Sequence, residues 1–152
     1  MSLNPIKVVI AEDHAIFRSS LILALNYHKS GIEIIGEAEN GQQLVTLTEI
    51  LQPDVVLTDI QMPIMDGLQA MKLIKTSSPH IRFVALTLLG DASIVKEMCK
   101  CGVDSYLLKN ANVEDIIRVI HLVAEGGSYF DKDIACYINW LSRTNDTITS
   151  IL

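Results

Sequence analysis

Polar side chains that can bind a metal or transfer a phosphoryl group follow several short apolar segments of this chain. They are three carboxylates, one hydroxyl and one lysine: Glu12, Asp13, Asp59, Thr87 and Lys109. The carboxyl ends of parallel strands meet at one edge of a sheet, so these side chains converge if the apolar segments are neighbouring strands. Three carboxylates placed together repel one another and raise each other's pKa, so a cation must offset them.

Magnesium is the cation that best suits this set. It prefers hard oxygen ligands and often rests on one or two carboxylates and a phosphate, while Lys109 supplies a fixed positive charge. Asp59 can then attack phosphorus as a nucleophile and form an acyl phosphate. Phosphoryl transfer needs mainly alignment and charge neutralisation, which a metal, a lysine and the Thr87 hydroxyl can provide. The pattern therefore predicts phosphoryl transfer at Asp59.

The elements that must position these residues alternate along the chain. Short apolar, β-branched runs are separated by longer amphipathic segments, as in a parallel sheet covered by helices on both faces. Five strands are expected, over residues 7–11, 32–38, 55–58, 83–87 and 105–108. Right-handed crossovers between them give a doubly wound α/β sheet whose functional crevice lies at the carboxyl ends of the strands.

The helices between these strands have recognisable starts. Asn40, Asp66 and Asn112 precede amphipathic segments and are expected to stand at helix N-termini, and Asp91 or Ser93 can cap another helix. After residue 127 the alternation stops, and residues 131–141 carry the apolar stripe of one more helix. We therefore expect a main domain over residues 1–127 and a linker helix with a short tail over residues 128–152.

Composition limits the functions that the chain can have. Its 152 residues, 49% of them hydrophobic, suit one domain with a packed core. A net charge of −6 opposes binding to nucleic acid through broad phosphate contacts. No apolar run approaches the roughly 20 residues of a membrane span, and the amino terminus lacks the blocks of a secretory signal. We expect a cytoplasmic protein that binds neither DNA nor a membrane by itself.

Four separated motifs resemble the receiver domains of two-component response regulators. They are Ala11-Glu12-Asp13, residues 57–67 (LTDIQMPIMDG), Ala85-Leu86-Thr87 and Tyr106-Leu107-Leu108-Lys109. The resemblance covers residues 7–127. It implies a flavodoxin-like fold with five strands in the order 2-1-3-4-5 and five flanking helices, Mg2+ as cofactor, and a histidine kinase or phosphotransfer protein as phosphoryl donor.

The resemblance also implies a role for each site residue. Asp59 would be the phosphoacceptor, Lys109 would contact the phosphoryl oxygens, and Thr87 would close on the phosphoryl group. The metal ligands would be Asp13, Asp59 and the backbone carbonyl of Gln61, with Glu12 assisting through water. Thr87 and Tyr106 would form the switch, a bistable element biased by the new phosphoryl contacts.

A narrower resemblance is to the receivers of transcription factors with a LuxR-type helix-turn-helix output. It rests on residues 36–41, on the 106–109 run without a following proline, and on residues 126–129. This resemblance implies that residues 128–152 lead toward a DNA-binding domain that is absent from this chain. From the position of Tyr106 we expect the output surface over residues 92–100, Tyr106 and residues 116–123. It would serve in dimerisation or in release of a tethered domain.

Three alternatives stay open. An aspartyl-nucleophile phosphatase normally carries a second acid two residues after the nucleophile, where this chain has Gln61. A nucleotide- or flavin-binding protein needs a glycine-rich loop after the first strand, where two acids stand instead. A degenerate receiver that serves as a constitutive interaction module is favoured only by Leu88, which is large enough to narrow access to Asp59. We expect a signalling module rather than an enzyme.

Two neighbours of the motifs have plainer interpretations. His14 follows the acidic pair at the start of a helix and is expected to be polar surface rather than a metal ligand or base. Asn110 replaces the proline that follows the lysine in many receivers, so a cis peptide bond there would cost roughly 2.5 to 4 kcal/mol, and we expect none.

Overall fold

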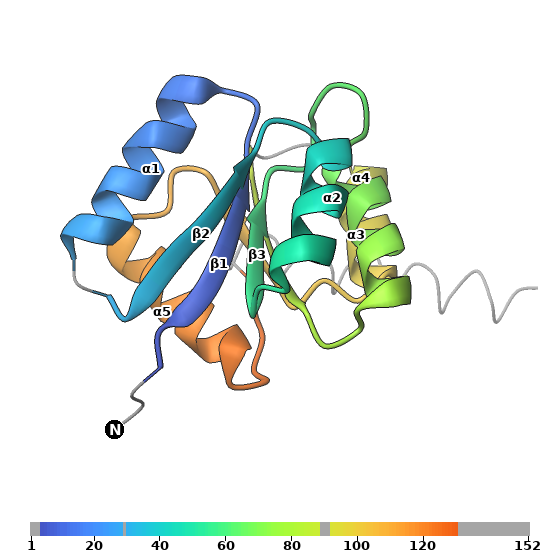
Figure 1. The fold of residues 1–152 in the computed structure, drawn as a ribbon. Coiled ribbons are helices and arrows are strands. Elements are labelled where there is room, and N and C mark those ends of the chain that lie inside the picture. Colours follow the sequence, from blue (N-terminus) through green and yellow to red (C-terminus); the bar gives the residue numbers. More distant parts are fainter. Residues whose placement is uncertain (1–3, 29, 89–91, 131–152) are drawn as a thin grey trace, which may run out of the picture.

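The computed structural model describes residues 4–28, 30–88 and 92–130, and within them the chain forms one parallel six-stranded sheet (Figure 1). The strands are β1 (Ile6–Ala11), β2 (Ile32–Ala38), β3 (Val55–Thr58), β4 (Arg82–Thr87), β5 (Ser105–Leu108) and β6 (Tyr129–Phe130). Their order in the sheet is β2-β1-β3-β4-β5-β6. The five expected strands and their order are confirmed, with β1 and β4 each beginning one residue earlier than expected.

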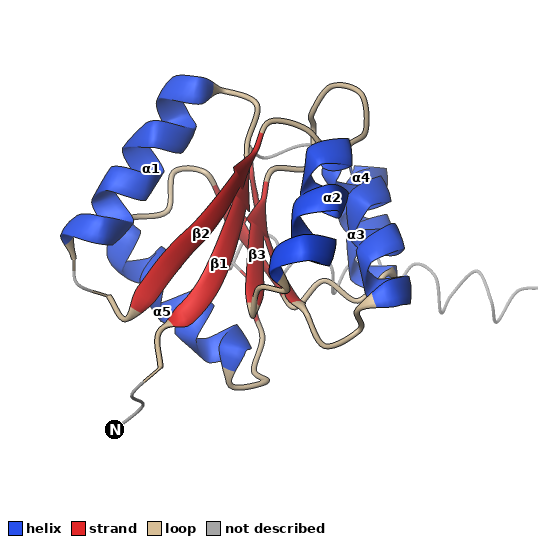
Figure 2. Ribbon diagram, in the orientation of Figure 1, coloured by secondary structure: helices blue, strands red, loops and turns tan. Residues whose placement is uncertain are grey.

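Five helices cover the sheet in two layers. They are α1 (Ala15–Tyr27), α2 (Gly41–Leu51), α3 (Gly67–Ser77), α4 (Ala92–Lys100) and α5 (Val113–Ala124). Figure 2 shows α1 and α5 on one side of the strands and α2, α3 and α4 on the other. Alternate strand residues point to opposite faces, so Val8 joins the core beneath α1 and α5, and Val9 joins the core beneath the other three helices. This is the doubly wound α/β architecture that the sequence predicts.

Side-chain caps fix the starts of three helices. Asn40 accepts a hydrogen bond from the backbone N–H of Gln43 at the start of α2. Asp66 forms a reciprocal capping box with Gln69 at the start of α3, and Asn112 caps α5. Such a cap contributes about 1 kcal/mol to stability. The expected caps at Asn40, Asp66 and Asn112 are confirmed, whereas the side chains of Asp91 and Ser93 lie outside the described residues.

The sixth strand was not expected. Tyr129 and Phe130 pair in parallel with Ser105 and Tyr106 of β5, and the Ser105 hydroxyl donates a hydrogen bond to the carbonyl of Tyr129. Two residues are too short to show a periodicity, and the preceding glycines signal a turn. The first residues of the expected linker therefore extend the sheet beyond β5. The helix expected over residues 131–141 lies outside the described residues.

Two glycines allow the loop between β3 and α3 to fold tightly behind Asp59. A Cβ at Gly67 would collide with the carbonyl oxygen of Asp59, and one at Gly41 would collide with the carbonyl oxygen of Met65. The backbone N–H of Gly67 donates to the carbonyl of Ile60 at 2.7 Å. The loop thus fixes the backbone that carries Asp59.

Two further expectations concern the described residues as a whole. None of their helices has the length and apolar character to cross a membrane. None of their peptide bonds is cis, which includes the bond between Lys109 and Asn110.

Candidate functional site

The three carboxylates meet where β1 and β3 end side by side. The backbone N–H of Asp59 donates to the carbonyl of Ala11 at 2.9 Å, which ties the two strand ends together. Glu12 and Asp59 are only 2% and 6% exposed, and Asp13 is partly buried. Buried carboxylates are rare unless a cation or hydrogen-bond donors accompany them.

Lys109 supplies the cation. Its Nζ lies 2.9 Å from Oδ2 of Asp59 and 3.0 Å from Oε2 of Glu12, and it stands 5.0 Å from the centre of the Phe17 ring. The backbone N–H of Lys109 donates to the carbonyl of Thr87 at 2.7 Å, so β4 and β5 jointly position the side chain. One ammonium group therefore bridges two buried carboxylates from two other strand ends.

These contacts divide the two carboxylates electrostatically. Burial acts to raise the pKa of Glu12, but hydrogen bonds from Lys109 and His14 outweigh it and lower that pKa. Burial raises the pKa of Asp59; Lys109 opposes this and the charge of Glu12 adds to it. Burial would lower the pKa of Lys109, but its bonds to both carboxylates raise it instead. The ammonium stays charged, and Asp59 is the carboxylate least compensated for its burial.

Asp13 provides the test of whether a metal fits here. Its Oδ1 is buried and has no hydrogen-bond partner among the described residues, which is costly for a carboxylate oxygen. Ligand atoms of Glu12, Asp13, His14 and Asp59 all lie within 4.8 Å of one another. Three of the four are carboxylates, and Mg2+ prefers such oxygen ligands. The donor set fits the expected Mg2+, and a bound cation would satisfy the Asp13 oxygen.

Thr87 and Tyr106 form a second group on the β4–β5 side. The Thr87 hydroxyl donates to the carbonyl of Leu88 at 3.0 Å and is also a hydrogen-bond partner of the Tyr106 side chain. Tyr106 is only 2% exposed, and burial raises its pKa above the ordinary value. The two residues expected to act as a switch are thus in direct contact.

The remaining predicted residues lie at the surface of the same edge. Gln61 is exposed in the loop after Asp59 and Ile60, and Leu88 is 70% exposed after Thr87. The roles given to the Gln61 carbonyl and to Leu88 stay predictions.

Two site residues were missed or undervalued from sequence. His14 is largely exposed, as expected for polar surface, but its Nδ1 lies 2.8 Å from Oε1 of Glu12 and 3.4 Å from Oδ1 of Asp13. The hydrogen bond to Glu12 and then the charge of Asp13 raise the pKa of His14. Arg18 is buried and donates to the carbonyl of Glu12. A charged residue on the same helical stripe as Leu21 and Leu25 was the available signal for Arg18.

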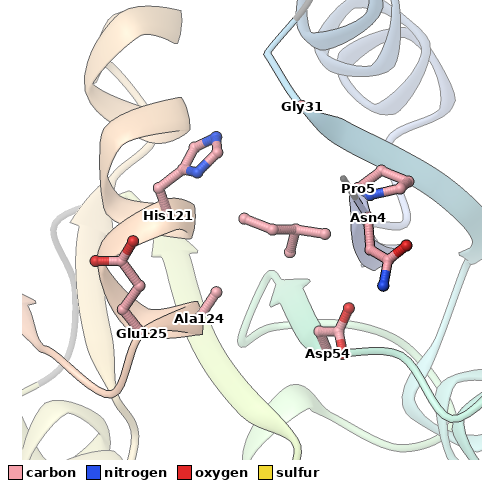
Figure 3. Close-up of a pocket in the computed structure, with 8 residues that line it drawn as sticks. Asn4, Pro5, Gly31, Asp54, His121, Ala124 and Glu125 are labelled. Atoms are coloured by element: carbon pink, nitrogen blue, oxygen red, sulfur yellow. The ribbon is translucent and has the colours of Figure 1, made fainter. Parts of the chain in front are cut away.

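A separate surface pocket of about 540 Å3 lies at the amino-terminal ends of the strands (Figure 3). It is lined by Asn4, Pro5, Ile6, Gly31, Asp54, His121, Ala124 and Glu125. The ring of His121 donates from Nε2 to the carbonyl of Ser30 at 2.6 Å, which fixes α5 against the loop before β2. None of the residues predicted for phosphoryl transfer or metal binding lines this pocket.

Comparison with known proteins identifies the family of this chain. Residues 8–121 match the response regulator receiver domain. The chain belongs to the response-regulator receiver family. The transcriptional regulatory protein DegU of Brevibacillus brevis is 34% identical over 133 residues, which cover 86% of this chain and 55% of DegU.

Two solved structures show the same likeness in three dimensions. A DNA-binding response regulator of the LuxR family from Staphylococcus aureus is 28% identical, with a TM-score of 0.74 over 78% of this chain and 98% of that one. The receiver of AraT from Geobacillus stearothermophilus is 32% identical, with a TM-score of 0.71 over 79% and 93% of the two chains. The resemblance to LuxR-type receivers is confirmed. The chain spans about half the length of the first curated relatives that it matches, DegU at 55% and LnrK of Bacillus subtilis at 58%.

Proposed function

We propose that this receiver accepts a phosphoryl group on Asp59 from a histidine kinase or phosphotransfer protein, with Mg2+ as cofactor. The observation that supports the proposal most strongly is the position of Lys109, whose Nζ bridges Asp59 and Glu12 next to the buried Asp13 oxygen that has no hydrogen-bond partner among the described residues. A structural role needs no such cluster, because burying an ion pair seldom stabilises a fold.

The reaction uses the Asp59 carboxylate as nucleophile. One of its oxygens attacks phosphorus, a P–O bond forms, the P–N bond of the donor phosphohistidine breaks, and the donor imidazole leaves with the bonding electron pair and takes up a proton. Mg2+, held by Asp13, Asp59 and the Gln61 carbonyl with Glu12 assisting through water, would neutralise charge on the phosphoryl oxygens. Lys109, already at 2.9 Å from Asp59, turns toward a phosphoryl oxygen. The residues then act through alignment and charge neutralisation.

The signal would pass through Thr87 and Tyr106. The Thr87 hydroxyl exchanges its bond to the Leu88 carbonyl for one to the phosphoryl group, and Tyr106, its hydrogen-bond partner, repacks. The output surface would comprise α4, Tyr106 and residues 116–123 of α5. In a longer protein with a LuxR-type domain this surface would control DNA binding, by dimerisation or by release of that domain.

The proposal describes a cytoplasmic signalling module rather than an enzyme that turns over an external substrate. A phosphatase that uses an aspartyl nucleophile would need a general acid near Gln61, and this position carries an amide instead. A degenerate receiver that only binds partners is the remaining alternative, and it predicts no covalent label on Asp59.

Covalent labelling tests the proposal. The protein is incubated with acetyl phosphate and Mg2+, and the adduct is measured by intact mass. We expect one phosphoryl group on the wild type, none on Asp59→Asn, and a normal adduct on Asp54→Asn, which alters an exposed carboxylate at the opposite end of the sheet. An adduct that survives in Asp59→Asn would contradict the assignment.

A further inference from the structure

Arg18 is an unusual residue for its position. It is the only charged residue in the α1 segment, residues 15–27, and its side chain is about 10% exposed. Arginine is seldom buried to this extent unless its guanidinium is paired. The burial of its guanidinium therefore requires specific partners.

Its guanidinium spans the ends of β1 and β2. Nη1 donates to the backbone carbonyl of Glu12 at 2.5 Å, Nε donates to Oε1 of Glu37 at 3.0 Å, and Nη2 lies 3.6 Å from Oε1 of Glu39. The side chains of the two β2-side glutamates are more than half exposed. They neutralise the guanidinium from the solvent side, which leaves Nη1 for the inner contact with Glu12.

The inner contact acts on the backbone that carries the acidic pair. The Glu12 N–H donates to the carbonyl of Ala38 at 2.9 Å, and the Glu12 carbonyl accepts from Arg18. Both peptide units that flank Glu12 are therefore held. The second unit leads directly into Asp13, so its orientation sets the direction in which the Asp13 carboxylate leaves the backbone. That carboxylate carries the buried oxygen without a hydrogen-bond partner.

We propose that Arg18 is a positioning residue for the metal end of the site: by holding the Glu12 carbonyl, it orients the Glu12 and Asp13 carboxylates toward a divalent cation. The inference rests on the proposed function, since it assumes that Mg2+ binds here. The contacts of the Arg18 guanidinium are with the Glu12 carbonyl, Glu37 and Glu39, so in this role it would not be a metal ligand. It acts through backbone geometry, as groups behind metal ligands commonly do, and their loss typically weakens metal binding about 10- to 100-fold.

Mg2+ affinity and the backbone amide signal of Asp13, measured on the same variants, test this role. Arg18→Met removes both the charge and the N–H donors of the guanidinium, and Arg18→Lys keeps the charge without the planar set of donors. Arg82→Met is the matched control, because Arg82 also pairs with a carboxylate, 3.5 Å from Asp104, but at a distance from the acidic cluster. The dissociation constant for Mg2+ is measured by calorimetry, and the backbone amide signal of Asp13 is followed by NMR.

We expect Arg18→Met to raise the dissociation constant about tenfold or more, Arg18→Lys to raise it less, and Arg82→Met to leave it unchanged. The Asp13 amide signal of the metal-free protein should shift in both Arg18 variants. A folded Arg18→Met or Arg18→Lys protein with the wild-type dissociation constant and unshifted Asp13 would show a purely structural role and overturn the inference.

Glu37→Gln keeps the inference falsifiable if both Arg18 variants unfold. It loosens the guanidinium from the exposed side, so it should weaken Mg2+ binding by less than about tenfold, and wild-type affinity in this variant would overturn the inference. The proposed function fails in a different way: a wild-type protein that binds no Mg2+ would remove the metal site itself, whatever Arg18 does.

Discussion

The two halves of the candidate site, one at the ends of β1 and β3 and the other at the ends of β4 and β5, are held in different ways. On the β1–β3 side, backbone bonds fix the strand ends, Lys109 bridges two carboxylates, and Oδ1 of Asp59 accepts from the N–H of Ile60 at 2.7 Å. On the β4–β5 side, the hydrogen-bond partners of the Thr87 hydroxyl among the described residues are the adjacent Leu88 carbonyl and Tyr106. The β1–β3 half already holds its charged groups in place. Under the proposed function, the Thr87 hydroxyl of the β4–β5 half would exchange its bond to the Leu88 carbonyl for one to the phosphoryl group. The contrast separates chemistry from signalling.

Removing the Lys109 ammonium, the cation of the β1–β3 half, should have the largest effect on stability. In Lys109→Met, Asp59 and Glu12 lose the counter-charge for two buried carboxylates, and breaking such a pair costs about 3 kcal/mol. We expect a loss of that size in the free energy of unfolding at neutral pH, measured with denaturant. The loss should shrink at acid pH, because burial raises the pKa of Asp59 and protonation removes the uncompensated charge.

Lys75→Met is the matched control for this prediction. Lys75 pairs with Asp104 at 3.4 Å and is more exposed than Lys109. A Lys109→Met protein that is no less stable than Lys75→Met would show that the bridge is not holding the buried charges.

Adding Mg2+ should stabilise the protein through the β1–β3 half alone. At 100 times its dissociation constant a ligand stabilises the folded state by about 2.7 kcal/mol, which thermal unfolding can measure. We expect this stabilisation to disappear in Asp13→Asn and to persist in Thr87→Ala. Equal responses of the two variants would mean that the halves are not separable.

Thr87→Ala should leave the chemistry and remove the signal. The variant loses a hydrogen bond worth about 1 kcal/mol, yet Asp59 should still take up beryllofluoride with Mg2+. Hydrogen exchange in α4, β5 and α5 should then stay at its unactivated level, whereas the wild type changes. Thr48→Ala, which removes a buried hydroxyl bonded within α2, should respond like the wild type. A full response in Thr87→Ala would remove Thr87 from the switch.

The smallest effect concerns the pH dependence of stability without metal. The pKa of Asp59 is higher in the folded than in the unfolded protein, so its stabilising contribution is present at acid pH and is lost as pH rises through the folded-state value. Asp59→Asn abolishes this loss, so the variant should be more stable than the wild type at neutral pH. Its gain in the free energy of unfolding should be smaller than the loss expected for Lys109→Met. The advantage should vanish at acid pH. Denaturant unfolding across pH checks this, and a constant difference at all pH values would be inconsistent with it.

Much of this fold was predictable because polar residues mark the ends of apolar strands. The bounds of β2, β3 and β5 and the caps at Asn40 and Asp66 follow from local patterns. The strand β6 does not, since its two residues are placed by pairing with β5. Strand ends and helix caps are local properties, whereas edge pairing is tertiary.

The candidate site was predictable in membership more than in geometry. The convergence of Glu12, Asp59 and Lys109 followed from the strand ends, and the structure brings them together. The contacts of His14 and Arg18 did not follow, because they depend on how the first turn of α1 folds back over β1 and β2. Spacing tells which strand ends meet, but it does not tell which neighbouring side chains turn inward.

A crystal structure with Mg2+ and beryllofluoride tests most directly whether the five converging residues act as one site. They are Glu12, Asp13, Asp59, Thr87 and Lys109. The account predicts the beryllium group on an Asp59 oxygen, Lys109 and the Thr87 hydroxyl on its fluorides, and the metal bound by Asp13 and Asp59. A structure with Asp59 unmodified under these conditions, or with Thr87 still bonded to the Leu88 carbonyl beside a modified Asp59, would contradict it.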